Sequence, residues 1–165
     1  LFRSGPGAVD GYLKRLGITE IRITATERTM HLATENQRIN TARPSALCSL
    51  FDRFLQGELL PQRETAWLRG LLEGCATGRN KLRAGLPPEV RLGHKTGSSD
   101  RTPEGIRIAD NDAGYVVLPD GRHYCITVLV TDSHHDDARN AGVIAAISEA
   151  TYEYFTNTRH KNGRP

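Results

Sequence analysis

The 165-residue chain is 38% hydrophobic and 25% charged, which is typical of one soluble domain with its own core. Its formal net charge of +3, from 22 Lys and Arg against 19 Asp and Glu, is spread out without a basic run, which argues against nucleic-acid binding. No apolar run reaches the ~18 residues that a membrane-spanning helix needs.

The first half of the chain is predicted to contain helices around one long loop. Apolar residues at helical spacing predict helices over residues 8–16, 44–56 and 62–73. Residues 24–43 are polar and aperiodic, and a loop of about 20 residues in a compact domain is usually functional or disordered. Residues 80–86 are expected to form a short helical turn before two prolines.

The second half is predicted to form three antiparallel strands and a closing helix. The strands are expected at about 89–97, 114–118 and 123–131, with Pro119-Asp120-Gly121-Arg122 as a hairpin turn between the last two. Residues 98–108 are interpreted as a polar connection, and the helix is expected at about 136–155 with a polar, frayed tail after it. This order indicates an α/β fold of the α+β type, with helices packed on an antiparallel sheet.

The segment His94-Lys95-Thr96-Gly97-Ser98-Ser99 ends the first predicted strand and has the composition of an anion-binding edge. Lys95 supplies charge for a carboxylate, and Thr96 or Ser98 supplies a hydroxyl donor. Gly97 lets a ligand approach the backbone closely, and the N–H that follows it can point at a developing oxyanion. A bare Lys-Thr-Gly tripeptide is weak evidence, because most such tripeptides are solvated turns.

A second candidate group lies in the long loop, where Glu27 precedes His31 by four residues. A loop carboxylate in a site can act as a general base on a water molecule. An isolated Glu is more often a solvated surface group. The functional interpretation therefore depends on the motifs that accompany Glu27.

Taken in order, these motifs resemble the class A serine β-lactamases. The resemblance covers nearly the whole chain: Glu27 in an omega-type loop at 24–43, two helices, HKTGSS, ADNDAG at 109–114, LPDGR at 118–122 and the last helix. The TE-x-x-MH and KTGSSD patterns resemble the extended-spectrum branch, in which a His replaces the usual Asn of the omega loop. The implied fold is β-lactamase/transpeptidase-like.

The resemblance implies a role for each matching residue. Glu27 activates the water that hydrolyses an acyl-enzyme, and His31 shapes the loop around that water. Lys95 and Thr96 bind substrate near its carboxylate, and Gly97 leaves room for it. Ser98 gives its backbone N–H to the oxyanion hole and a hydroxyl to the substrate. Lys81 falls near the place where some members carry a carboxylate-binding Arg.

Two family motifs are absent from these 165 residues, namely Ser-x-x-Lys and Ser-Asp-Asn. Asp110-Asn111 is not part of a Ser-Asp-Asn motif, because it follows an Ala and comes after the Lys-Thr-Gly. The chain, which begins at Leu1, is therefore interpreted as the C-terminal portion of a single β-lactamase-like domain, spanning residues 1–165. The whole enzyme is expected to hydrolyse penicillins and cephalosporins and to confer antibiotic resistance, whereas this portion alone is expected to be inactive.

Two alternatives remain open. A penicillin-binding D,D-transpeptidase or carboxypeptidase shares the superfamily, but the omega-loop Glu argues against it, since such an enzyme protects its acyl-enzyme from water. A non-catalytic truncated remnant is favoured by the missing nucleophile. The resemblance implies no cofactor, a small-molecule β-lactam partner, a monomer when complete, and a periplasmic or secreted location.

Other potentially reactive residues are given structural interpretations. Cys48, Cys75 and Cys125 fit neither a zinc pattern nor a dense disulfide framework, so small buried side chains are expected, with the pairing of Cys48 and Cys75 left open. His134-His135-Asp136-Asp137 resembles a metal cluster, but adjacent histidines point apart and the acids suit a helix N-terminus, so no metal is expected.

Overall fold

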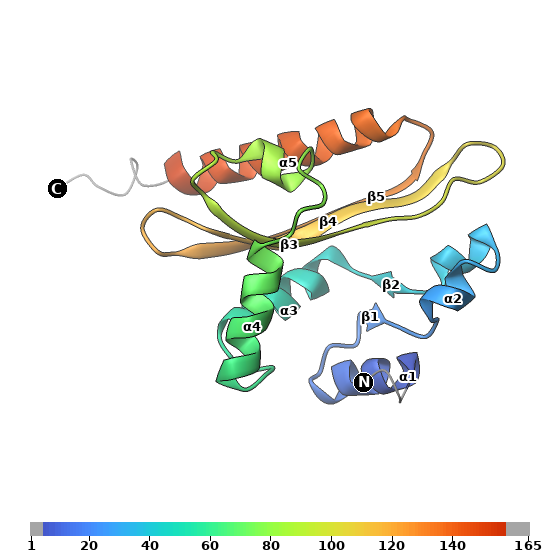
Figure 1. The fold of residues 1–165 in the computed structure, drawn as a ribbon, viewed down its shortest axis with the longest axis horizontal. Helices are drawn as coiled ribbons and strands as arrows, with labels where there is room; N and C mark the ends of the chain where they lie inside the picture. The colour runs from blue at the N-terminus through green and yellow to red at the C-terminus, as the bar shows by residue number, and fades with distance from the viewer. Residues whose placement is uncertain (1–4, 158–165) are drawn as a thin grey trace.

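A three-stranded antiparallel sheet forms the centre of the molecule, with helices on both faces (Figure 1). The computed structural model describes residues 5–157. Helix α5 and the short turn η2 cover one face, and α3 and α4 lie against the other. This arrangement confirms the predicted fold class, and the strand order in the sheet is β3-β4-β5. The strands are β3 (Arg91–Ser98), β4 (Arg107–Val117) and β5 (His123–Ser133), and the helices are α3 (Pro44–Leu55), α4 (Gln62–Glu73), η2 (Leu82–Gly85) and α5 (Asp137–Asn157).

Strand β4 differs from its prediction, because it begins at Arg107 and not at residue 114. Residues 110–113, which precede the predicted start of the strand, pair with both neighbours; Asp110, for example, lies opposite Ser98 of β3 and Val130 of β5. Acidic residues are rare in strands, which is why this segment reads as a loop. The predicted hairpin is present, with Leu118 N–H donating to the Arg122 carbonyl at 2.8 Å.

The main hydrophobic core lies between the sheet and the α5–η2 layer. Its centre is Ile144 of α5, which is fully buried against side chains of β4 and η2. The cluster contains Leu82, Leu86, Val90, Leu92, Val116, Leu118, Tyr124, Ile126, Val128 and Ile144. Asp136 Oδ1 accepts from the Arg139 N–H at 2.7 Å at the start of α5, as the acidic start of the predicted helix indicated.

Shortening the central side chain of this core should destabilise the fold. We expect Ile144→Ala to lower the free energy of unfolding by about 2–5 kcal/mol, because it leaves a cavity in a closed core. The neighbouring Val143→Ala, at a side chain that is 43% exposed, is the control and should change stability by less than about 0.5 kcal/mol. Urea unfolding measures both, and equal effects would contradict this placement of α5.

The opposite face of the sheet packs on α3 through one aromatic cluster. Tyr115 of β4 is fully buried, and its ring centroid lies 6.3 Å from Phe51 and 6.5 Å from Phe54. Its hydroxyl donates to Glu73 Oε1 of α4 at 3.1 Å. A Cβ added to Gly93 of β3 would come within 2.3 Å of the Tyr115 ring, so a glycine is needed there.

The N-terminal part forms a smaller layer beside the sheet. The predicted loop at 24–43 contains regular structure, namely a helical turn, a 3-10 turn and a short strand. Its ends are joined by a two-stranded ladder in which Ile21 pairs with Ala42 and Arg22 with Thr41. The Asn40 side chain lies at the base of the loop. Its amide oxygen accepts hydrogen bonds from the Thr24 and Ala25 N–H groups at 2.9 Å, and its amide nitrogen donates to the Ala25 carbonyl at 3.0 Å. The elements are α1 (Pro6–Arg15), β1 (Ile21–Arg22), α2 (Glu27–Met30), η1 (Thr34–Arg38) and β2 (Thr41–Ala42).

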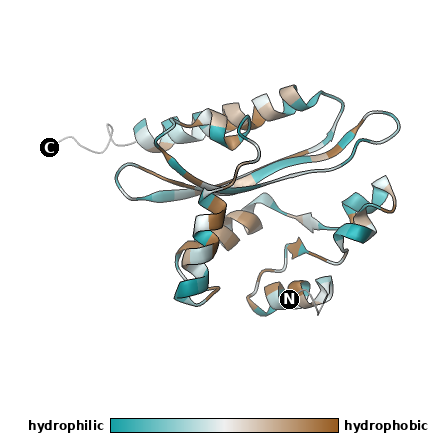
Figure 2. Cartoon of the chain, in the orientation of Figure 1, coloured by the Kyte–Doolittle hydropathy of each residue, from teal (hydrophilic) through white to brown (hydrophobic). Residues whose placement is uncertain are grey.

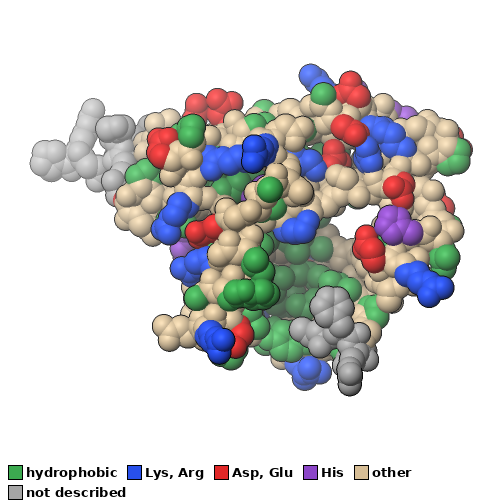
Figure 3. All heavy atoms as spheres, viewed as in Figure 1, with side chains coloured by type: hydrophobic (Ala, Val, Ile, Leu, Met, Phe, Trp, Pro, Cys, Tyr) green, Lys and Arg blue, Asp and Glu red, His purple; other side chains and the backbone are tan. Residues whose placement is uncertain are grey.

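An apolar surface opens between α1, α3 and α4. Figure 3 shows hydrophobic side chains gathered over α4 and in the hollow beside it, and Figure 2 shows that α3 is hydrophobic whereas α2 is hydrophilic. Trp67 and Leu71 of α4 are 68% and 53% exposed. A pocket of about 260 Å³ here is lined by Tyr12, Leu50, Phe51, Phe54, Leu59, Leu60, Leu68 and Leu72.

The three cysteines are free and half-buried, so Cys48 and Cys75 do not pair. Burial raises the pKa of the Cys125 thiol to about 12, with smaller contributions from Asp52 and Cys48. Among the described residues, no helix is long and apolar enough to cross a membrane. The predicted frayed tail lies outside the described residues from position 158 onward, whereas Thr156 still belongs to α5.

The raised pKa makes a labelling prediction. Because the thiolate is the reactive form, we expect iodoacetamide at pH 8 to leave Cys125 unmodified in the folded chain. Peptide mass spectrometry would measure alkylation at each cysteine, with the urea-unfolded chain as the control in which all three react. Equal rates for Cys125 in the folded and unfolded chain would contradict the described burial.

Candidate functional site

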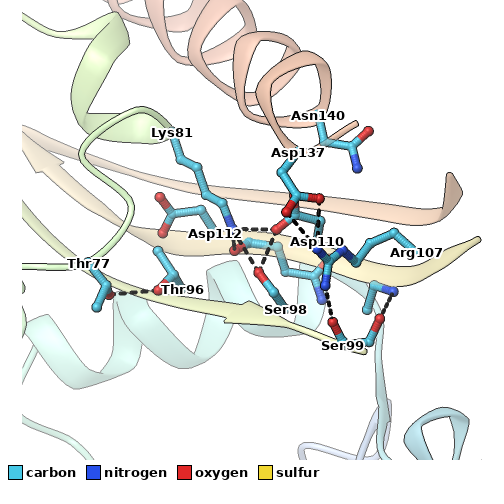
Figure 4. A network of polar contacts seen from close by, with 12 residues as sticks. Thr77, Lys81, Thr96, Ser98, Ser99, Arg107, Asp110, Asp112, Asp137 and Asn140 are labelled. Carbon is cyan, nitrogen blue, oxygen red and sulfur yellow. Dashed lines mark hydrogen bonds and ion pairs between the residues drawn. The ribbon is translucent and has the colours of Figure 1, made fainter. Parts of the chain in front are cut away.

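A polar network lies behind the end of β3, where the Lys-Thr-Gly segment was predicted to bind a ligand (Figure 4). Alternate residues of a strand share a face, so Thr96 and Ser98 point toward Asp110 and Asp112 of β4 and toward Lys81. Thr96 Oγ1 lies 2.7 Å from Thr77 Oγ1. The Ser98 hydroxyl donates to Asp110 Oδ1 at 2.6 Å.

Lys81 is buried, not exposed to a ligand. Its Nζ lies 2.5 Å from Asp110 Oδ1 and also donates to Ser98 Oγ at 3.2 Å and to the Asn111 carbonyl at 3.3 Å. A substrate carboxylate therefore does not have a free cation at this position. The Ser98 side chain likewise points into the protein, where its hydroxyl donates to Asp110.

A second carboxylate lies two residues further along the same face of β4. Asp112 is fully buried, and its oxygens lie 2.8 and 3.1 Å from Nδ1 of His94. The backbone N–H of Leu82 donates to the same carboxylate at 3.2 Å. Each buried acid of β4 thus has a basic partner, as the cost of burying an unpaired charge requires.

The outer edge of β3 is the part that a ligand can reach. Ser99 N–H donates inward to the Ala109 carbonyl of β4 at 2.8 Å. Since successive N–H groups point to opposite sides of a strand, the Ser98 N–H points to the free edge. A Cβ on Gly97 would meet nothing within 4 Å, so the space beside it is open. Lys95 is exposed, and its Nζ donates to the Thr96 carbonyl at 2.6 Å.

The loop residues Glu27 and His31 lie at opposite ends of α2. Thr26 caps this helix by accepting from the Thr29 N–H at 3.0 Å, which places Glu27 in the first turn. Glu27 is 79% exposed, and its Oε1 lies 3.3 Å from His31 Nε2.

The loop is tied to the sheet just beyond the Lys-Thr-Gly segment. Asp100 Oδ2 lies 3.3 Å from His31 Nδ1 and accepts from Gln37 Nε2 at 2.6 Å, while the Asp100 N–H donates to Gln37 Oε1 at 2.7 Å. Arg38 adds a two-point ion pair with Asp132 of β5 at 2.6 and 3.1 Å. These contacts place the loop that carries Glu27 beside the end of β3.

The structure thus brings the predicted residues into one region in two groups. Lys95, Thr96, Gly97 and Ser98 share the β3 edge, and Glu27 reaches that edge only through His31 and Asp100. Sequence reasoning missed Asp110, Asp112 and Asp100. The sequence does contain a signal for the two acids of β4. Asp110 and Asp112 are two residues apart and pair with Ser98 and Thr96 of β3, so these side chains share one polar face of the sheet. Within residues 5–157, no group of three His, Cys, Asp or Glu side chains could hold a metal ion.

Comparisons with known proteins found relatives over nearly the whole chain. The Beta-lactamase enzyme family matches residues 1–155. A beta-lactamase of Bacteroides uniformis is 40% identical over 153 residues, which cover 92% of this chain and 52% of that protein. The extended-spectrum beta-lactamase PER-1 of Pseudomonas aeruginosa is 31% identical over 150 residues, which cover 91% of this chain and 48% of that protein.

Solved structures show the same fold. A class A beta-lactamase from Bacteroides cellulosilyticus superimposes with a TM-score of 0.90 at 40% identity, over 94% of this chain and 56% of that one. PBP-A superimposes with a TM-score of 0.78 at 25% identity, over 93% and 52%. The fold is that of the class A serine β-lactamases.

This chain belongs to the beta-lactamase enzyme family, and its similarity is to class A members. It spans about half the length of the curated relatives that it matches.

Proposed function

We propose that residues 1–165 are the C-terminal portion of a class A β-lactamase domain that hydrolyses penicillins and cephalosporins. The observation that carries the proposal is the tie between the Glu27 loop and the β3 edge, made by Asp100 with His31 and Gln37. Because this tie joins the loop that carries Glu27 to the residue just beyond β3, it supports a role for both segments in one site. Family membership supports the reaction class.

In the proposed reaction, a Ser supplied by the upstream portion attacks the lactam carbonyl, and the C–N bond of the ring breaks as the nitrogen takes a proton. The Ser98 N–H stabilises the oxyanion. Glu27 then takes a proton from a water molecule that attacks the acyl ester, and the departing Ser oxygen regains a proton. Lys95 and Thr96 hold the substrate carboxylate, and His31 orients Glu27.

Further parts of the proposal follow from the family. The whole protein confers antibiotic resistance, acts as a monomer without a cofactor, and works in the periplasm or outside the cell. The chain alone is inactive, since the printed sequence contains no Ser-x-x-Lys. The similarity to PBP-A favours one second candidate, a penicillin-binding transpeptidase or carboxypeptidase.

The test is hydrolysis of a chromogenic cephalosporin by the protein with its upstream residues, beside the 165-residue chain. Turnover by the longer protein alone supports the proposal. A stable acyl-enzyme without turnover favours the penicillin-binding alternative. If the longer protein neither acylates nor hydrolyses, the chain is part of a non-catalytic remnant.

A further inference from the structure

The buried pair of Lys81 and Asp110 lies directly behind the ligand-facing edge of β3 (Figure 4). Their side chains are 9% and 4% exposed. An ammonium group has three N–H donors, and Lys81 directs them to Asp110, Ser98 and the Asn111 carbonyl. None of its protons is left for a ligand.

The Ser98 hydroxyl likewise uses its only proton in a hydrogen bond within the protein. It has one proton, which goes to Asp110 Oδ1, and it accepts from Lys81. The hydroxyl therefore has no proton left to donate to a ligand.

No other described acid can take the place of Asp110. Asp112 is held by His94 and the Leu82 N–H, and Asp137 is paired with Arg107, at the start of β4, and with Arg101. The charge that Lys81 presents at the edge is therefore set by Asp110.

We propose that Asp110 is a specificity-determining residue that withholds the Lys81 charge and the Ser98 proton from the carboxylate of a bound β-lactam. This inference rests on the proposed function and deepens it. Recognition of the substrate carboxylate then depends on the exposed Lys95 and on Thr96. The unusual consequence is that removing an acid from this site strengthens the binding of an acidic substrate.

The test is steady-state kinetics of the protein with its upstream residues on a carboxylate-bearing chromogenic cephalosporin and on its methyl ester. In Asp110→Asn, KM for the carboxylate substrate should fall about five-fold, as one added ionic contact near a surface allows. KM for the ester should not change. In the neutral pair Lys81→Met with Asp110→Asn, KM should return to the parent value. Asp120→Asn, which removes the same charge at the opposite end of the sheet, controls for net charge.

An unchanged or raised KM in Asp110→Asn would overturn the inference, and so would a double variant that behaves like the single one. If the role of Asp110 is purely structural, KM in Asp110→Asn should be unchanged or raised, and kcat should fall for both substrates. Near-UV circular dichroism checks that each variant is folded.

A second measurement needs neither turnover nor a variant. Acetylation of the folded parent protein should modify Lys81 at least about ten times more slowly than the exposed Lys14 and Lys95, because a buried, ion-paired ammonium is not nucleophilic. Equal rates would overturn the inference even in an active enzyme. A protected Lys81 in a parent protein that does not turn over would instead refute the proposed function and, with it, the role toward substrate.

Discussion

Glu27→Gln is expected to lower the deacylation rate constant of the protein with its upstream residues by about 10³-fold. The amide keeps the shape of the side chain but cannot take a proton from water. Acylation should continue, so that the acyl-enzyme accumulates. Intact-mass spectrometry would detect the covalent adduct, and burst kinetics with a chromogenic cephalosporin would give the two rate constants.

Glu35→Gln is the matched control for this experiment. Glu35 lies in the same loop and is also exposed, but its carboxylate pairs with Arg38 Nε at 3.1 Å and not with His31. Its loss should change turnover by less than about two-fold, as expected for a surface ion pair. If the Glu27 variant turns over as fast as its parent, the role given to Glu27 is wrong, whatever the second variant does.

Gly93→Ala is expected to destabilise the fold by about 3 kcal/mol, the upper end of the usual cost of overpacking a core. The added methyl group would meet the Tyr115 ring at 2.3–2.5 Å. That ring cannot move away, because Phe51 and Phe54 of α3 pack against it. Urea unfolding measures the loss.

Gly97→Ala provides the comparison, on the same face of the same strand. A methyl group there meets nothing within 4 Å, so stability should change by less than about 0.5 kcal/mol. The methyl group would instead occupy the space beside the β3 edge and raise KM for a β-lactam. Equal unfolding curves for the two variants would contradict the packing of Tyr115 described above.

The helices and the hairpin were predictable because their signals are local. Apolar spacing marks α3, α4 and α5, and Pro119-Asp120-Gly121-Arg122 marks the turn between β4 and β5. The start of β4 was not predictable in this way. Asp110 and Asp112 can lie in a buried strand because Lys81 and His94, which are 29 and 18 residues away in the sequence, hydrogen-bond to their carboxylates.

The loop at 24–43 was predicted, but its internal structure was not, for a related reason. Hydrogen bonds of polar side chains stabilise the loop, and the spacing of apolar residues in the sequence does not predict such bonds. The Asn40 amide organises its base, and Asp100, 63 residues beyond Gln37, anchors its tip. The sequence thus indicated Glu27 and the Lys-Thr-Gly edge as separate motifs. It did not indicate which side chains join them or that Asp110 neutralises Lys81.

The ladder of β1 and β2 has a consequence for how this protein can change. Because Ile21–Arg22 and Thr41–Ala42 fix both ends of the loop, its length is uncoupled from the position of the sheet. Closing a flexible loop becomes less favourable by only ~0.6 kcal/mol for each doubling of its length. Insertions at its exposed turn, near Ala33, would therefore widen one wall of the site at little thermodynamic cost. The length of this loop can thus change without any change in the core.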